Sequence, residues 1–158
     1  RKCLVIPDGA FRNPMTVEQI QNQIVRMPLT GVVMDGSTVF NFAQKEVPIL
    51  VDSLTKMAET TKEDIDWFLF HQPNKFMLQK LAERIGVPFE KMPMDIVEKF
   101  GNSNSATIPT AITADLKEEM LNKESLCCLA GFGAGVAWAG IIMKMGNMDF
   151  CDTIISDL

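Results

Sequence analysis

The chain has 158 residues, of which 47% are hydrophobic and 22% charged, a composition typical of one soluble globular domain with its own core. A formal net charge of −5 argues against generic nucleic-acid binding, which requires a basic surface. No apolar run approaches the ~20 residues that a membrane-spanning helix needs, so neither membrane insertion nor a membrane partner is predicted.

The sequence begins RKCLVIPDGAFRNP, without an initiator Met and without the charged, apolar and small-residue order of a signal peptide. We therefore expect a fragment or a processed piece of a cytoplasmic protein. The cysteines are expected to be reduced thiols: Cys127 and Cys128 are adjacent in an apolar run, and Cys3 and Cys151 lie near the ends. With one histidine and no CxxC pair, no metal site is predicted.

Residues 1–36 are rich in Pro, Gly, Asn and Asp, which predicts a weakly organised lead-in from a segment further upstream. Within this lead-in, KCLVI at 2–6 predicts a short strand, and TVEQIQNQIV at 16–25 predicts a short amphipathic helix with Thr16 as its N-cap. The folded domain is predicted to occupy residues 37–158.

A clear helix is predicted next, because apolar residues recur at intervals of three and four and so share one helical face. These residues are Phe40, Ala43, Val47, Leu50, Leu54 and Met57. Pro48 lies within the pattern and is expected to kink the helix or to remove one hydrogen bond. The sequence IDWFLF at 65–70 then predicts a strand that is buried on both faces apart from Asp66.

Pro73 suits the first turn of a second helix, which ends at the GVP sequence of 86–88. A loop with at most a short helix follows. A third helix is predicted from Ala106 to about Asn122, because apolar residues recur there at every fourth position. These residues are Ile108, Ile112, Leu116 and Met120.

Two apolar strands, SLCCLAGF at 125–132 and VAWAGIIMKM at 136–145, are joined closely enough by GFGAG to form a hairpin. The predicted order is therefore helix, strand, helix, helix, strand, strand. This order predicts an α/β fold in which helices pack against a mixed sheet.

The only histidine, His71, directly follows the predicted strand 65–70. α/β folds usually place their sites at the carboxyl ends of strands, and imidazole changes its charge most easily near neutral pH. On position alone, a histidine that is hydrogen-bonded in an ordinary loop is an equally good interpretation.

Two further motifs are ambiguous when each is taken alone. In FGNSNSATIP, Gly101 permits unusual backbone angles and Asn102 carries an amide that can donate, but simple capping of the next helix is the better explanation. In GFGAGVAWAG, alternate glycines let a turn bring backbone N–H groups close to a ligand, and a plain glycine-rich hairpin explains it as well. No helix follows the latter motif, which argues against a nucleotide-binding fingerprint.

Taken together and in order, HQPN, GNSNSATIP and GFGAGVAWAG, with MDGSTVFNFA before them, resemble the C-terminal half of ketoacyl-acyl carrier protein synthase III. These proteins are condensing enzymes of the thiolase superfamily. The resemblance implies one half of a thiolase-like five-layer αβαβα sandwich with a mixed sheet. It also implies a missing N-terminal half of the same protein as partner, a homodimer at full length, and a role in fatty acid biosynthesis.

The resemblance implies a decarboxylative Claisen condensation of an acyl-coenzyme A primer with malonyl-acyl carrier protein, carried out by a Cys, a His and an Asn. His71 and Asn102 match the family's His and Asn, and their N–H groups would stabilise the enolate, at ~3–4 kcal/mol for one such donor. Ala134 matches the residue whose backbone N–H helps to form the oxyanion hole, next to Gly133, and Phe132 would shape the nearby wall. The implied substrates are coenzyme A and phosphopantetheine thioesters, with no further cofactor.

Two departures from the family pattern concern the catalytic cysteine and the docking of the carrier protein. None of the four cysteines stands at the matching position, so this chain alone is predicted to be inactive. Where many relatives carry a basic docking residue, this chain has Phe76. Lys75 beside it, or Lys80 and Arg84 on the same helical face, would supply positive charge instead, although an ordinary solvated face is an equal alternative. Asn104 also replaces a Ser that is common in the signature.

Two other readings remain open. One is another thiolase-superfamily acyltransferase, such as a hydroxymethylglutaryl-CoA synthase or a polyketide-type synthase. These enzymes use the same Cys, His and Asn chemistry but a different acceptor substrate. The other is a non-catalytic scaffold half, against which the presence of both His71 and Asn102 argues. An isolated half is also expected to expose apolar surface and therefore to associate.

Overall fold

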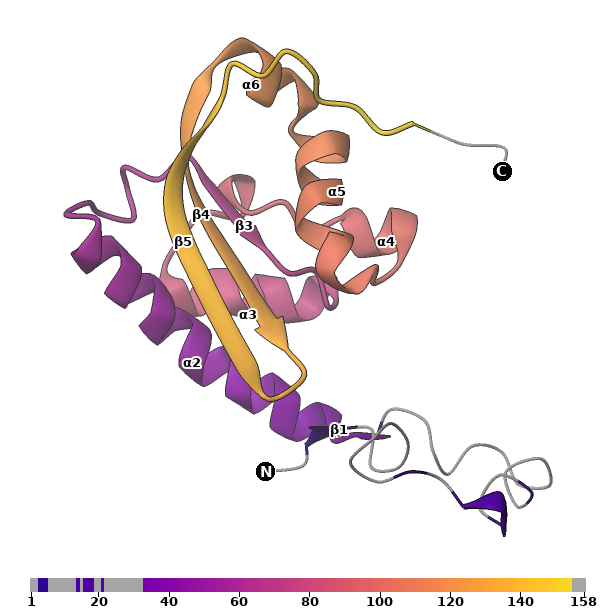
Figure 1. Ribbon diagram of the computed structural model, residues 1–158. Helices are drawn as coiled ribbons and strands as arrows, with labels where there is room; N and C mark the ends of the chain where they lie inside the picture. Colours follow the sequence, from indigo (N-terminus) through magenta and orange to yellow (C-terminus); the bar gives the residue numbers. More distant parts are fainter. Residues whose placement is uncertain (1–2, 6–13, 15, 19–20, 22–32, 155–158) are drawn as a thin grey trace. The chain divides into compact units, whose positions relative to one another are not determined.

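The computed structural model of the chain describes residues 3–5, 14, 16–18, 21 and 33–154 (Figure 1). The chain divides into two compact units, one formed by Arg1–Phe42 with Gly133–Ala137 and the other by Ala43–Phe132 with Trp138–Leu158. None of the helices in the described part is long and apolar enough to cross a membrane.

In the first unit, strand β1 (Leu4–Val5) pairs antiparallel with β2 (Val33–Met34), so the short strand predicted at KCLVI is confirmed over two residues. The helix predicted at 16–25 lies mostly outside the described residues. The predicted boundary between residues 36 and 37 stays a prediction.

Helix α2 (Gly36–Met57) begins directly after Asp35, whose carboxylate caps it. Asp35 Oδ1 accepts the Thr38 N–H at 3.1 Å, and Oδ2 accepts the Thr38 hydroxyl at 2.6 Å. Together with a hydrogen bond from Ser37, these contacts lower the pKa of Asp35 to about 2. A carboxylate also suits the positive end of the helix dipole, so Asp35 both starts the helix and stays ionised.

The second unit contains a three-stranded mixed sheet in the order β3 (Trp67–Phe70), β4 (Glu124–Gly133), β5 (Ala137–Gly146). Strand β3 runs parallel to β4, and β4 continues through a tight connection into its antiparallel neighbour β5, which confirms the predicted hairpin (Figure 1). Asp66, the polar exception in the apolar run, extends the sheet: its carboxylate accepts the Leu126 N–H at 2.8 Å.

The remaining elements lie between β3 and β4 in the sequence. They are helix α3 (Lys75–Ile85), the 3₁₀ turn η1 (Phe89–Lys91), helix α4 (Ile96–Phe100), the 3₁₀ turn η2 (Asn104–Ala106), helix α5 (Thr107–Asp115) and helix α6 (Lys117–Asn122).

The buried face of α2 is only partly the predicted one. The helix continues through Pro48 without interruption, and Ala43 and Val47 are fully buried as expected. Met57, however, is 81% exposed, and the buried face instead includes Gln44. Burial of this polar side chain is possible because its amide donates to the Met77 carbonyl of α3 at 3.1 Å.

Helix α3 begins later than the sequence predicts. Asn74 is its N-cap, and the Asn74 Oδ1 accepts the Met77 N–H at 2.8 Å, so Pro73 lies before the cap and not in the first turn. The helix ends as predicted at Gly86, whose φ of 82° is a left-handed conformation that glycine adopts without a steric penalty.

The single helix predicted from Ala106 to Asn122 is wrong, because the chain forms α5 and α6 with a break at Leu116 (φ −120°, ψ 18°). A stripe with a spacing of four drifts around a helix of 3.6 residues per turn, so one straight helix would rotate its later residues away from the sheet. With the break, Ile112, Leu116 and Met120 all stay in one core cluster with Leu69 of β3.

Strand β3 is covered on both faces. Leu69 packs with the α5–α6 residues, and successive side chains of a strand alternate, so the fully buried Phe68 and Phe70 face the other side. Figure 1 shows α2 and α3 on that side. Coverage on both faces is the reason why β3 reads as an almost continuous apolar run.

Candidate active site

His71 is held rigidly at the carboxyl end of β3. Its backbone N–H donates to the Ala130 carbonyl at 2.8 Å, which extends the parallel ladder to this residue. Its half-buried ring stands edge-on to the ring of Phe132, with centroids 5.6 Å apart and an interplanar angle of 79°. The ring nitrogen Nδ1 lies 2.8 Å from the hydroxyl oxygen of Thr107, the first residue of α5.

Burial lowers the pKa of His71 below its usual value of 6.5, and a hydrogen bond to the Asn104 backbone opposes this shift only in part. Burial disfavours the charged form of a histidine. The imidazole is therefore neutral at pH 7, with one nitrogen that donates and one that accepts.

Asn102 lies in the short loop between α4 and η2. Gly101 before it has φ 71°, a backbone conformation that a residue with a Cβ would adopt only with strain. The Asn102 Oδ1 accepts the backbone N–H of Asn104 at 3.0 Å. This contact orients the amide, and the Nδ2 donors of Asn102 have no partner among the described residues.

The backbone of Asn104 connects this loop to His71. Asn104 has φ 52°, a left-handed conformation that asparagine tolerates better than most residues. Its carbonyl accepts the Thr107 hydroxyl at 2.9 Å, and the Thr107 oxygen also accepts the Gln72 N–H at 3.3 Å. We refer to His71, Gln72, Asn102, Asn104 and Thr107 as the His71 cluster.

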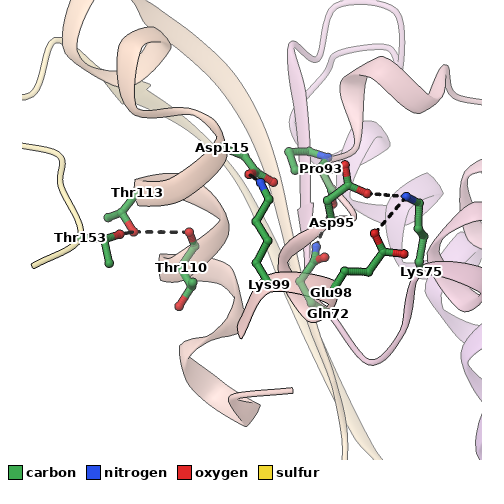
Figure 2. Close-up of polar contacts among 10 residues, drawn as sticks. All are labelled: Gln72, Lys75, Pro93, Asp95, Glu98, Lys99, Thr110, Thr113, Asp115 and Thr153. Carbon is green, nitrogen blue, oxygen red and sulfur yellow. Dashed lines mark hydrogen bonds and ion pairs between the residues drawn. The ribbon is translucent and has the colours of Figure 1, made fainter. Parts of the chain in front are cut away.

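The side chain of Gln72 anchors the cluster to neighbouring backbone carbonyls. It is fully buried, and its amide donates to the Pro93 carbonyl at 2.8 Å (Figure 2). The same amide also donates to the Phe70 carbonyl at 3.2 Å. These hydrogen bonds join the end of β3 to the segment that leads into α4. The C-cap of α4 is Gly101, which directly precedes Asn102.

Ion pairs hold α4 on both sides. Lys75 of α3 contacts Asp95 at 2.7 Å and Glu98 at 3.4 Å, and Lys99 contacts Asp115 of α5 at 2.9 Å (Figure 2). Each of these exposed pairs stabilises the fold only slightly. Together they fix the direction from which the chain enters the Asn102 loop.

A family model described as "3-Oxoacyl-[acyl-carrier-protein (ACP)] synthase III C terminal" matches residues 55–145 of the chain. The chain belongs to this family. A β-ketoacyl-[acyl-carrier-protein] synthase III of Synechocystis sp. is 33% identical over 142 residues, 90% of this chain and 42% of the relative. One of Prochlorococcus marinus is 35% identical over 115 residues, 73% of this chain and 34% of the relative.

The fold agrees with that of solved family members. The crystal structure of a 3-oxoacyl-(acyl-carrier protein) synthase from Burkholderia xenovorans matches with a TM-score of 0.82 and 36% identity, over 96% of this chain and 43% of that one. The predicted α/β, thiolase-like half domain with a mixed sheet is thus confirmed. The chain spans less than half the length of these synthase III relatives.

The cysteines of this chain are poorly suited to be the nucleophile of a condensing enzyme. All four are free and buried. Burial raises the pKa of Cys127 to about 11 and that of Cys128 to about 12, so both stay protonated at neutral pH. Because the thiolate is the reactive form, these strand residues are structural.

The residues that the resemblance assigns to the oxyanion hole and its wall are consecutive, at the end of β4 and in the connection that follows it. Phe132 is buried against His71, where a wall of the site is expected. Gly133 is the last residue of β4, and Ala134 lies in the connection to β5; both belong to the first unit. The roles of Gly133 and Ala134 stay predictions.

The positive patch proposed for carrier-protein docking is largely neutralised. Lys75 contacts two carboxylates, and Lys80 contacts Glu83 at 2.7 Å. In the described part of the chain, Arg84 alone of the three has no ion pair. A docking role for these residues stays a prediction, with Arg84 as its best candidate.

Sequence reasoning missed Thr107 and Gln72. Thr107 stands in GNSNSATIP, a motif from which the sequence predicts a helix entry and a donor role for Asn102 but no role for Thr107. No pattern in the sequence links position 107 to position 71, because the contact depends on how α5 packs on the end of β3.

Proposed function

We propose that this chain is the C-terminal part of a 3-oxoacyl-[acyl-carrier-protein] synthase III, an acyltransferase of fatty acid biosynthesis in the cytoplasm. In the full-length protein, an upstream cysteine takes the acyl group of an acyl-coenzyme A. Malonyl-acyl carrier protein loses carbon dioxide, and the enolate carbon attacks the acyl-cysteine carbonyl. The cysteine sulfur leaves, and 3-oxoacyl-acyl carrier protein is the product.

The observation that carries this proposal is the His71 cluster. The hydrogen bonds from Asn102 through Asn104 and Thr107 to His71 join both residues that match the family's His and Asn in one network. A network of this kind holds catalytic groups in place before substrate binds, which is how donors stabilise charge that develops in a transition state. A scaffold that had lost its activity would have no need to retain it.

The missing half of the protein is the proposed partner of strand β5. Its side chains Ile141 and Met143 are two positions apart and therefore lie on one face of the strand, which we call the β5 surface. They are 51% and 40% exposed. Neighbouring exposed apolar side chains of this size are typical of a surface that another part covers. We expect this chain alone to self-associate in size-exclusion chromatography, and a strictly monomeric chain that binds no hydrophobic dye would contradict this expectation.

The test is intact-protein mass spectrometry of the full-length protein after exposure to acetyl-coenzyme A and to longer acyl-coenzyme A thioesters. An acyl adduct on a cysteine upstream of this segment supports the acyl-transfer step, and the retained chain length defines the primer. Absence of any adduct would favour the scaffold alternative. Addition of malonyl-acyl carrier protein then separates a carrier-dependent synthase from the branches that use a coenzyme A acceptor.

A further inference from the structure

The Thr107 hydroxyl has three polar neighbours, and for two of them the direction of the hydrogen bond is fixed. The Gln72 N–H, 3.3 Å away, can only donate, and the Asn104 carbonyl, 2.9 Å away, can only accept. The third neighbour is His71 Nδ1 at 2.8 Å. Because a hydroxyl has one proton and two acceptor positions, all three hydrogen bonds form together only if Nδ1 carries a proton and donates to Thr107.

The opposite arrangement loses one of these bonds. If the Thr107 hydroxyl donated to a bare Nδ1, its hydrogen bond to the Asn104 carbonyl would break. The side chain is 1% exposed, so burial makes the loss costly. The imidazole ring has little freedom to rotate away from Thr107, because Phe132 packs against it and the His71 backbone is hydrogen-bonded to the sheet.

We propose that Thr107 is a positioning residue that holds neutral His71 in the tautomer with the proton on Nδ1, so that Nε2 presents a lone pair in the resting protein. One buried hydrogen bond separates the two tautomers, which corresponds to about a tenfold excess of the Nδ1–H form.

The consequence for catalysis rests on the function proposed above. A bare Nε2 accepts a proton before it can donate one. The thiol proton of the upstream cysteine is a suitable source: as sulfur bonds to the acyl carbonyl carbon, the proton moves to Nε2, and coenzyme A leaves as the thiolate. His71 is then an imidazolium whose Nε2–H faces the later enolate, and it returns the proton when the cysteine sulfur leaves in the condensation.

The test uses nuclear magnetic resonance on the ¹⁵N-labelled chain, in which the single histidine makes the ring signals unambiguous. Spectra that correlate the ring nitrogens with the ring C–H protons are recorded about 2 pH units above the ordinary histidine pKa, where the ring is neutral. We expect a protonated Nδ1 and an unprotonated Nε2. The reverse pattern in the unsubstituted chain would overturn the proposal.

Two substitutions test whether Thr107 is the cause. Thr107→Ser keeps the hydroxyl and should keep the Nδ1–H pattern, whereas Thr107→Val removes the acceptor and should shift the population toward Nε2–H. An unchanged Nδ1–H pattern in Thr107→Val would refute the role of Thr107. If circular dichroism shows that the valine variant does not fold, Thr107→Ala makes the same test without added bulk.

This measurement needs no substrate. A failure of the tautomer prediction therefore leaves the proposed synthase function standing, and a failure of the acylation experiment leaves the tautomer assignment standing.

Discussion

The His71 cluster and the β5 surface belong to the same sheet but differ in how far this chain supplies their contacts. In the cluster, polar groups from the end of β3, from α5 and from the loop between them hydrogen-bond to one another at 2.8–3.3 Å. On the β5 surface, large apolar side chains remain 40–51% exposed. The contacts that orient His71 and Asn102 are therefore made within this chain. No element among the described residues covers the β5 surface.

The largest expected effect concerns the cluster. In the full-length protein, His71→Ala or Asn102→Ala should each lower the rate of condensation about 10²–10³-fold, because each removes one donor to the enolate oxygen. Rates are measured with malonyl-acyl carrier protein under saturating primer. Lys56→Ala, at the exposed last turn of α2, is the control outside the cluster and should leave kcat unchanged. Similar kcat values for the His71 variant and the unsubstituted protein would refute the site.

Core and edge residues of the same sheet should differ in their contribution to stability. Leu69→Ala creates a cavity between β3 and the helices α5 and α6 and should cost about 2–5 kcal/mol of unfolding free energy. Ile141→Ala on the β5 surface should change it by no more than about 0.5 kcal/mol in this chain. Urea unfolding measures both.

The full-length protein sharpens this contrast. If the missing half covers β5, Ile141→Ala should cost more there than in the isolated chain, while the cost of Leu69→Ala stays similar. An equal, negligible effect of Ile141→Ala in both would show that β5 is not covered.

A smaller effect is expected at the start of α3, just beyond the cluster. Asn74→Ala removes the acceptor for the Met77 N–H and should destabilise the chain by about 1 kcal/mol. Asn74→Asp keeps an acceptor and serves as the matched control. A loss of stability in both variants would mean that the amide group itself, and not the cap, is important.

The smallest effect is the pH dependence that His71 produces. Its folded pKa lies below the unfolded value of about 6.5, so the unfolded chain binds more protons between these two values. Stability should therefore fall as the pH drops below about 6.5 and level off below the folded pKa. The urea midpoint of His71→Gln, compared with that of the unsubstituted chain, isolates this contribution, and a histidine titration midpoint above 6.5 would contradict it.

Local sequence patterns were sufficient to predict much of the fold. Strand β3, the β4–β5 hairpin and the C-terminal end of α3 at Gly86 follow from local pattern, because periodicity and turn chemistry are properties of neighbouring residues. The break at Leu116 did not follow, since it depends on keeping Ile112 and Met120 against the sheet. For the same reason the burial of Gln44 requires the Met77 carbonyl of another helix.

The sequence by itself determined the family, the candidate pair His71 and Asn102, and the lack of a suitable cysteine. These conclusions rest on residue identities in order along the chain. Only the tertiary structure decided how the pair is held: Thr107 and Gln72 reach His71 because α5 packs at the end of β3, across 36 positions in sequence for Thr107. A hydrogen bond between distant segments leaves no mark in the spacing of residues, so the tautomer of His71 became a question only once its neighbours were known.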